Sequence, residues 1–276
     1  LISMRSPCRD LATAFGVHRA LDAAGAMLGP LIAFLVLAAM PRHFDVLFAI
    51  SFAAALAGVG VIVVCVDPAD GRADTRVPMA AGRARDLLQA PRFRAIVIAG
   101  SLLALPTMSD SFIFLAVQHR MQIGVPAFPL FYVATSLFTA AFAVPAGRLA
   151  DRFGRTRVLV AGYVLLAAVY ATLAAPIAPL AAALGALGLL GAYYAATDGV
   201  LTAMAAAALP AAVSGTGLSV LSTATGASRL VASVVFGWVW TRAGIATATA
   251  WYGVALAVAI LAAIVVLVRA ERSAAG

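Results

Sequence analysis

The chain has 276 residues, of which 64% are hydrophobic and 11% are charged. Soluble domains carry about a quarter charged residues, so this composition excludes an ordinary water-soluble protein. The formal charge of +8 would suit a polyanionic partner, but the basic residues lie in alternate connections between apolar segments. That distribution is typical of membrane topology, and no nucleic acid is expected as a partner.

Eight apolar segments of about twenty residues recur along the chain, each long enough to cross about 30 Å of hydrocarbon as a helix. They lie at roughly 14–39, 44–66, 95–118, 126–147, 158–175, 179–205, 214–240 and 245–268. No segment shows the alternating pattern of a membrane β-barrel strand. We therefore predict an all-α, polytopic membrane protein with eight transmembrane helices in a lipid bilayer.

All nineteen basic residues are arginine, and the seventeen that lie outside the spans are divided unequally between two sets of connections. One set, with both ends of the chain, holds Arg5, Arg9, Arg72, Arg76, Arg83, Arg85, Arg92, Arg94, Arg148, Arg152, Arg155, Arg157, Arg269 and Arg272. The opposite connections hold only Arg42, Arg120 and Arg242. Because cytoplasmic loops are enriched in arginine, the sequence predicts a plasma or inner membrane protein with both ends of this chain in the cytoplasm.

The connection over residues 67–92 is longer than the others. It begins with a flexible polar composition and continues with an amphipathic pattern up to Pro91 that is typical of a short helix at the membrane surface. Two spans precede this cytoplasmic linker and six follow it. We therefore divide the chain into a partial bundle over 1–66, the linker with its interfacial helix over 67–92, and a six-helix bundle over 93–276.

A short basic motif separates the fourth and fifth spans. It contains Gly147, Asp151, Arg152, Gly154 and Arg155 in the stretch GRLADRFGRTRVL. The two glycines permit a tight turn, and the carboxylate can accept hydrogen bonds from free amides at a helix N-terminus. The motif resembles the cytoplasmic-loop signature of the major facilitator superfamily of transporters, which this family carries between helices 2 and 3 and again between helices 8 and 9.

The first span carries a second spaced pattern, formed by Gly16, Gly25, Gly29 and Pro30. Two glycines four residues apart allow another backbone to approach closely, and the proline removes one helical hydrogen bond and bends the span. The pattern resembles the one on the fifth helix of the family's drug–proton antiporters, although Ala33 and Phe34 depart from its closing glycines.

The order of the two motifs implies which part of the family fold is present. The fifth-helix pattern comes first, so the later loop motif is similar to the second copy, between family helices 8 and 9. The chain would then correspond to helices 5–12, a complete C-terminal half with the last two helices of the N-terminal half, and four further helices are expected in the intact protein. The resemblance also implies that Asp151 braces against the start of the first span and that the loop arginines contact the anionic inner membrane surface.

Charged residues inside membrane spans are costly and therefore mark candidate functional positions. Five occur here: Arg19, Asp22, Asp110, Asp198 and Arg229. Arg19 and Asp22 are three residues apart and can pair on one helix face. Arg19 and Asp198 lie at matching depths, so we expect a gating contact between them on the cytoplasmic side.

A second pairing is expected deeper in the membrane. Pro106 breaks the helix one turn before Asp110, and interrupted helices commonly form transporter binding sites near the midplane. Arg229 lies at about the same height by residue count. We therefore predict that Asp110 and Arg229 form an ion pair across the cavity, as a switch that responds to protons or substrate or as a static contact that orients helices.

These patterns together favour a secondary transporter that works by alternating access. The resemblance implies proton-coupled efflux of a small apolar or amphiphilic substrate, with the proton as coupling ion; symport and uniport remain open. No cofactor or metal is expected, since His18, His43 and His119 lack metal-ligand spacing. The alternatives are a truncated or non-transporting helical scaffold and a membrane-embedded enzyme. The short loops show no polar catalytic cluster, and a scaffold would not require five buried charges.

Overall fold

The computed structural model describes residues 11–40, 43–65, 86–176 and 178–275. Within these ranges the chain is helical and contains no strand, so the predicted all-α class is confirmed. The helices are α2 (Leu11–Ala26), α3 (Leu28–Ala39), α4 (Phe44–Cys65), α6 (Pro91–Ala104), α7 (Asp110–Met121), the 3₁₀ turn η2 (Val125–Ala127), α8 (Phe128–Phe153), α9 (Arg155–Ala174), α10 (Pro179–Ala207) and α11 (Ala211–Ala275). Most of the predicted linker, including the start of its amphipathic segment, lies outside the described residues.

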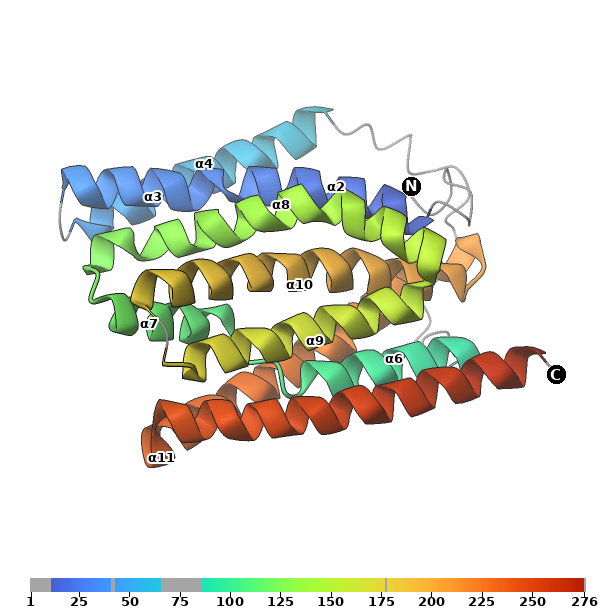
Figure 1. Cartoon of the computed structure of the whole chain (residues 1–276). Helices are drawn as coiled ribbons and strands as arrows, with labels where there is room; N and C mark the ends of the chain where they lie inside the picture. Colours follow the sequence, from blue (N-terminus) through green and yellow to red (C-terminus); the bar gives the residue numbers. More distant parts are fainter. Residues whose placement is uncertain (1–10, 41–42, 66–85, 177, 276) are drawn as a thin grey trace.

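Six helical segments among the described residues are long and apolar enough to cross a membrane. One of them, Ala12–Ala39, joins α2 and α3, and another, Val213–Arg272, has 60 residues. The long segment reverses direction at Gly244, whose φ of 81° favours glycine, so α11 forms two antiparallel arms (Figure 1). Helices α6 and α7 are each too short to span the bilayer but follow one another as a single interrupted crossing. The helices therefore form the eight predicted passes.

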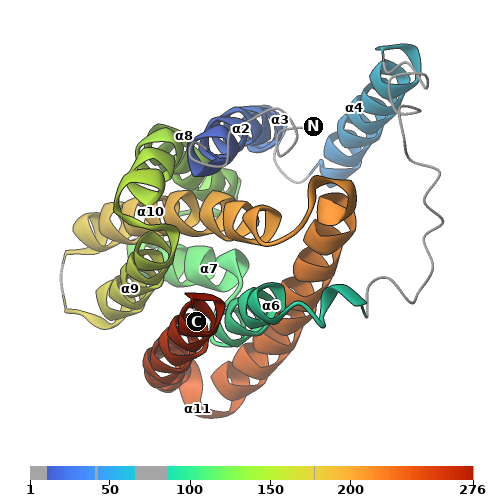
Figure 2. The same cartoon turned by 90° about the vertical axis from the view of Figure 1, so that its right-hand side faces the viewer.

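Helix α10 lies at the centre of the bundle. It packs against α8, α9 and α2, and the two arms of α11 lie beside α6 and α9 (Figures 1 and 2). Small residues permit this close packing. A Cβ added to Gly162 on α9 would lie 2.6 Å from the Thr197 methyl group of α10, and one added to Gly191 on α10 would lie 2.4 Å from the Phe138 side chain of α8.

Helices α2, α3 and α4 form a separate layer at one side of this bundle. Helix α2 packs along α8 and also contacts α10, whereas α4 packs mainly against α3 and stands apart from the other helices in Figure 2. Large apolar side chains such as Phe48 and Phe52 are exposed along α4. The part of the chain before the linker therefore meets the part after it chiefly through α2 and α3.

The break between α6 and α7 is held by one tyrosine. Pro106 cannot donate a backbone hydrogen bond, and residues 105–109 leave the helix, as the proline predicted. The buried Tyr170 hydroxyl, on α9, donates to the Pro106 carbonyl (2.8 Å) and accepts from the Met108 amide (3.0 Å). Backbone groups freed inside a membrane need such partners, so Tyr170 fixes the position at which α7 begins.

Replacement of Tyr170 by phenylalanine should lower the stability of the protein by about 1–3 kcal/mol, because two buried backbone groups lose their partner. Thermal unfolding of the purified protein measures this effect. Tyr132→Phe is the matched control, since that side chain is 42% exposed. Equal midpoints for the two variants would contradict the assigned role of Tyr170.

Candidate functional site

Asp151 binds the N-terminus of α2. Its carboxylate accepts hydrogen bonds from the amides of Ala12 (3.2 Å) and Thr13 (2.8 Å) and from the Thr13 hydroxyl (2.8 Å). These amides belong to the first turn of a helix, which has no internal acceptors for them and carries partial positive charge. Arg155, four residues along, forms an ion pair with the same carboxylate (3.1 Å). The contact that the loop motif implied between Asp151 and the first span is therefore present.

The two glycines of the loop motif have different roles. Gly154 is the single residue between α8 and α9, with a φ of 100° that L side chains rarely adopt. From the sequence we expected Gly147 to form part of a turn, but this residue lies inside α8. The helix extends six residues beyond the predicted end of its span. A Cβ there would lie 2.6 Å from the Ala12 carbonyl oxygen of α2. Gly16 makes the reciprocal contact, since its Cβ would lie 2.6 Å from the Ala143 carbonyl oxygen.

No described helix packs against the remaining glycines of the first span, so their predicted packing face stays a prediction. A Cβ added to Gly25 or Gly29 would meet no atom of the described residues within 4 Å. Gly16, nine residues before Gly25, carries the close helix contact instead. The boundary between α2 and α3 falls at Met27, one turn before Pro30, and Met27 itself keeps helical φ and ψ angles. In the loop motif, Arg152 stacks on Phe153 with its guanidinium carbon 5.3 Å from the ring centre.

Four of the five charged span residues form one connected cluster. Arg19 on α2 donates to Asp22 (3.0 Å) and to Asp198 on α10 (2.5 Å). Asp198 also forms an ion pair with Arg229 on α11 (3.4 Å). The expected contacts of Arg19 with Asp22 and with Asp198 are therefore present. The cluster connects α2, on one side of the linker, to α10 and α11 on the other.

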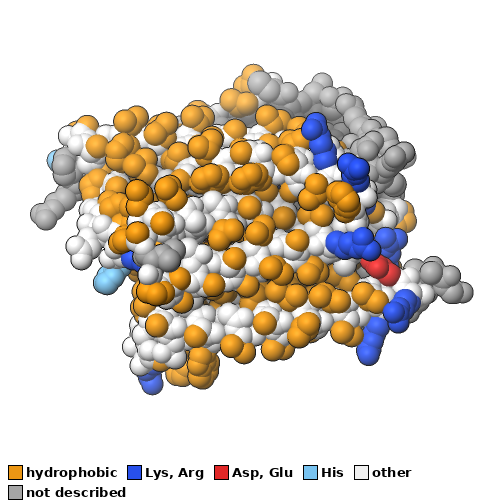
Figure 3. All heavy atoms as spheres, viewed as in Figure 1, with side chains coloured by type: hydrophobic (Ala, Val, Ile, Leu, Met, Phe, Trp, Pro, Cys, Tyr) orange, Lys and Arg blue, Asp and Glu red, His pale blue; other side chains and the backbone are white. Residues whose placement is uncertain are grey.

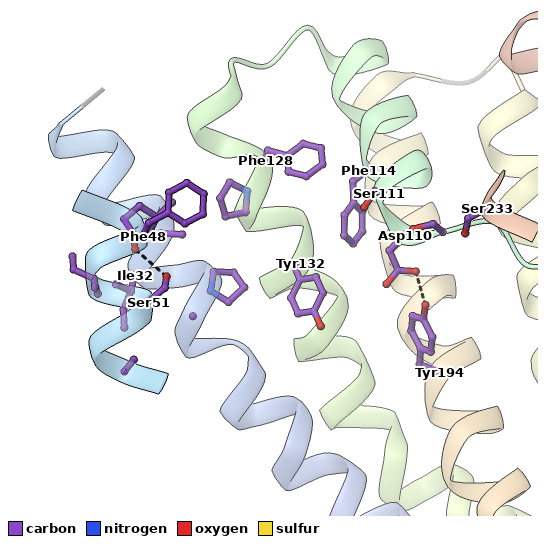
Figure 4. A pocket seen from close by; sticks show the side chains of 18 of the residues that line it. Ile32, Phe48, Ser51, Asp110, Ser111, Phe114, Phe128, Tyr132, Tyr194 and Ser233 are labelled. Carbon is purple, nitrogen blue, oxygen red and sulfur yellow. Dashed lines mark hydrogen bonds between the residues drawn. The ribbon is translucent and has the colours of Figure 1, made fainter. Parts of the chain in front are cut away.

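The predicted ion pair between Asp110 and Arg229 is wrong. Arg229 pairs with Asp198, and Asp110 instead accepts a hydrogen bond from the Tyr194 hydroxyl on α10 (Figure 4). Both groups nevertheless line the same cavity, as residue counting led us to expect. Counting alone could not show which way each side chain points around its helix. Tyr194 was not singled out from the sequence, although its spacing of four residues from Asp198 places both side chains on one face of α10.

Three adjoining cavities surround these residues. The outer cavity, of about 720 Å³, lies between the α3–α4 pair and helices α7, α8 and α10, and is lined by Asp110, Tyr194 and Arg229 among others (Figure 4). A middle cavity of about 250 Å³ is lined by all five charged residues. A third cavity, of about 460 Å³, contains the side chains of His18 and Asp198. The charge cluster therefore lies between two larger spaces, within the 300–1,000 Å³ typical of small-molecule sites.

Arginine side chains are distributed unevenly along the length of the helix bundle. Figure 3 shows apolar side chains over most of this face and blue arginine side chains gathered at one end, where α8 passes into α9 and α11 ends. We call this the arginine-rich end. The contacts of Asp151 and Gly147 with α2 lie toward this end, while the outer cavity lies toward the opposite one.

The family profile of the Major Facilitator Superfamily matches residues 95–275. The chain belongs to this superfamily. The match covers the region after the linker, including the loop motif and the helices that carry Asp110, Asp198 and Arg229. Membership points to a transporter rather than to an enzyme and supports a multi-pass membrane protein.

Among major facilitator proteins, the chain is similar to an uncharacterized MFS-type transporter of Methanocaldococcus jannaschii, with 26% identity over 250 residues. The alignment covers 87% of this chain and 60% of that protein, so the chain spans about three fifths of its relative's length. No solved structure matches the chain significantly.

Proposed function

We propose that this major facilitator chain forms part of a secondary active transporter that moves a small amphiphilic molecule across the membrane by alternating access. The observation that carries the proposal is the series of adjoining cavities, which is lined by charged side chains inside an otherwise apolar bundle. Charged side chains that lie within membrane spans and face a cavity are typical of transport pathways. A purely structural scaffold has no need of them.

Alternating access requires a contact that can close one end of the pathway and open again. Here α2 closes against α8 and α10 through Asp151, through the glycine contacts and through the pairing of Arg19 with Asp198. All three connections join the segment before the linker to the bundle after it. Separation of α2 from both α8 and α10 would break them together, so they form one two-state element.

The arginine-rich end lies in the cytoplasm in this proposal, since cytoplasmic loops are enriched in arginine. The outer cavity then faces the opposite side, and the described conformation is closed toward the cytoplasm. Asp110 and Asp198 offer carboxylates along the pathway that can accept coupling protons. Together with the antiporter-like pattern on the first span, they favour proton-coupled efflux.

The division of the chain follows from the same reasoning. Residues 1–66 would contribute two helices of the N-terminal bundle, 67–92 the linker, and 93–276 the complete C-terminal bundle. The length of the relative from Methanocaldococcus jannaschii leaves room for the four additional helices that the family fold requires. We expect them to cover the exposed faces of α3 and α4.

Proteoliposomes containing the protein, expressed from its complete coding sequence, test this function. An imposed proton gradient should drive flux of an amphiphilic dye at a rate at least about tenfold above that of empty vesicles. Asp151→Ala should reduce this flux about tenfold, because the α2 N-terminus loses charge-assisted hydrogen bonds that are stronger than neutral ones. Arg152→Gln, in the same motif, should retain most of it, since the described contact of that side chain is its stacking on Phe153. A flux that is the same with and without the proton gradient would contradict proton coupling. Equal flux in the two variants would contradict the role of Asp151.

A further inference from the structure

The middle cavity differs from the outer cavity in the chemistry of its walls. The outer cavity is lined largely by apolar and aromatic side chains, such as Phe48 and Phe114. In the middle cavity, every lining residue except Ala23 and Ala26 has a polar or charged side chain. Its volume of about 250 Å³ has room for several waters, since each occupies about 30 Å³. The outer cavity therefore suits an amphiphilic molecule, and the middle cavity suits water.

A stripe of hydroxyl groups on α8 forms one wall of the middle cavity. Tyr132, Thr135, Ser136 and Thr139 follow one another at helical spacing and share one face of the helix. The Thr135 hydroxyl donates to the Phe131 carbonyl (3.0 Å), and the Thr139 hydroxyl donates to the Thr135 carbonyl (2.9 Å). A hydroxyl that has donated its hydrogen can only accept further bonds. Both threonines therefore present acceptors to the cavity, and a water can donate to each of them.

The middle cavity also joins two carboxylates that lie apart. Asp110 borders the outer and the middle cavity, and Asp198 borders the middle and the third. Asp110 accepts from Tyr194, whereas Asp198 accepts from arginines, and no hydrogen bond joins the two carboxylates in the described part of the chain (Figure 4). The titratable and charged groups that face this space are Arg19 and Asp22 on α2, Asp110 on α7, Tyr132 on α8, Tyr194 and Asp198 on α10, and Arg229 on α11.

We propose that the middle cavity holds a hydrogen-bonded cluster of waters that carries protons between Asp110 and Asp198, and that Thr135 and Thr139 position this cluster. The role rests on the proposed proton-coupled transport and supplies its proton route. A proton that leaves Asp110 passes to a neighbouring water, each water passes one proton to the next, and one proton reaches Asp198. The threonines only accept, so they hold waters in place and do not themselves transfer a proton.

This route separates protons from the transported molecule. The molecule occupies the outer cavity, and the waters occupy the middle cavity. Asp110 is the carboxylate that borders both spaces, so its protonation state can respond to either occupant. Asp198 borders the third cavity as well, which continues the route beyond the charge cluster.

Hydroxyl-radical labelling tests the water cluster without requiring transport. Radicals formed from bound water by a short X-ray pulse oxidise the side chains that touch this water. In the purified protein, expressed from its complete coding sequence, Tyr194 should be oxidised at least about tenfold faster than Tyr193. The two tyrosines are neighbours on α10, but Tyr193 is fully buried and borders none of the three cavities. Thr135→Val combined with Thr139→Val keeps the side-chain shapes, removes both acceptors and should slow Tyr194 labelling about threefold or more.

Proton-driven flux of the amphiphilic dye into vesicles tests the proton route. The valine pair should reduce this flux about tenfold, because the waters lose two of their acceptors. Thr135→Ser with Thr139→Ser keeps both hydroxyls and should retain most of the flux. Thr172→Val is the matched control, since its hydroxyl likewise donates one turn back, to the Ala168 carbonyl (2.7 Å), and borders none of the three cavities.

Three results would overturn the water route: equal labelling of Tyr193 and Tyr194, unchanged Tyr194 labelling in the folded valine pair, or unchanged flux in that pair. If the valine pair does not fold, the comparison of the two tyrosines in the wild type still decides. Rapid Tyr194 labelling in a wild-type protein that shows no proton-driven flux would refute the proposed coupling and leave the water cluster standing. Wild-type flux that the valine pair retains would instead leave the transport function standing.

Discussion

Gly147→Ala is expected to reduce transport by at least about tenfold while the protein still folds and inserts. A Cβ at this position would lie 2.6 Å from the Ala12 carbonyl oxygen and 2.9 Å from the Thr13 Cα atom. Both neighbours are backbone, so no side chain can rotate to relieve the contact, and α2 must move away from α8. That movement breaks the hydrogen bonds of Asp151 with the α2 N-terminus. The substitution should therefore shift the population toward the state that is open at the arginine-rich end.

Chemical accessibility can measure this shift. In a background without Cys8 and Cys65, Thr139→Cys places a thiol of similar size on α8, at a position that is 5% exposed in the closed arrangement. Its reaction with a water-soluble maleimide added from the arginine-rich side should accelerate when Gly147→Ala is present. Gly253→Ala is the control, since no described atom lies within 4 Å of a Cβ at that position. Unchanged thiol reactivity and unchanged transport in Gly147→Ala would show that the helix contact does not gate the pathway.

Asp198→Asn should impair the protein far more than Asp22→Asn, although both remove one carboxylate from the same cluster. Asp198 serves two arginines, and its loss leaves Arg229 without its ion-pair partner and with a buried Nε atom that has no acceptor among the described residues. Asp22 is 58% exposed, and its ion-pair partner among the described residues is Arg19, which retains Asp198. We expect Asp198→Asn to lower stability by about 1–2 kcal/mol and to abolish transport. The cost stays below that of a fully buried pair because the arginines are partly solvated.

Thermal unfolding and vesicle flux, compared between the two variants, measure this difference. A second substitution tests the cause: Arg229→Gln in the Asp198→Asn background removes the stranded charge and should recover part of the stability. An exchange of Arg19 and Asp198 would be a poor test of their pairing, because an arginine at position 198 would face Arg229. Equal losses for Asp198→Asn and Asp22→Asn would contradict the central position of Asp198.

The fold class and the family were predictable from local sequence features. Span length and composition predict membrane helices because the bilayer imposes one thickness and requires every backbone group to be paired. Pro106 predicted the interruption near Asp110 because it lacks an amide hydrogen. The loop motif indicated the contact of Asp151 with the first span, although Asp151 and Thr13 are 138 residues apart in the sequence. The alternation of arginines along the chain indicated the polarity that the bundle surface displays.

The sequence by itself determined which residues are exceptional in this membrane protein: five charges inside spans, one spaced glycine pattern on the first span and one basic loop motif. Residue counting also gives the depth of each in the bilayer, since a helix rises by a fixed 1.5 Å per residue. Only the tertiary structure decided which of them meet. The rotation of each helix about its own axis brings Arg229 to Asp198 and leaves Asp110 to Tyr194. It also brings Gly16, rather than Gly25 or Gly29, against a neighbouring helix. The rotation of each helix depends on its packing against the side chains of all its neighbours. It therefore cannot be derived from the sequence of one span alone.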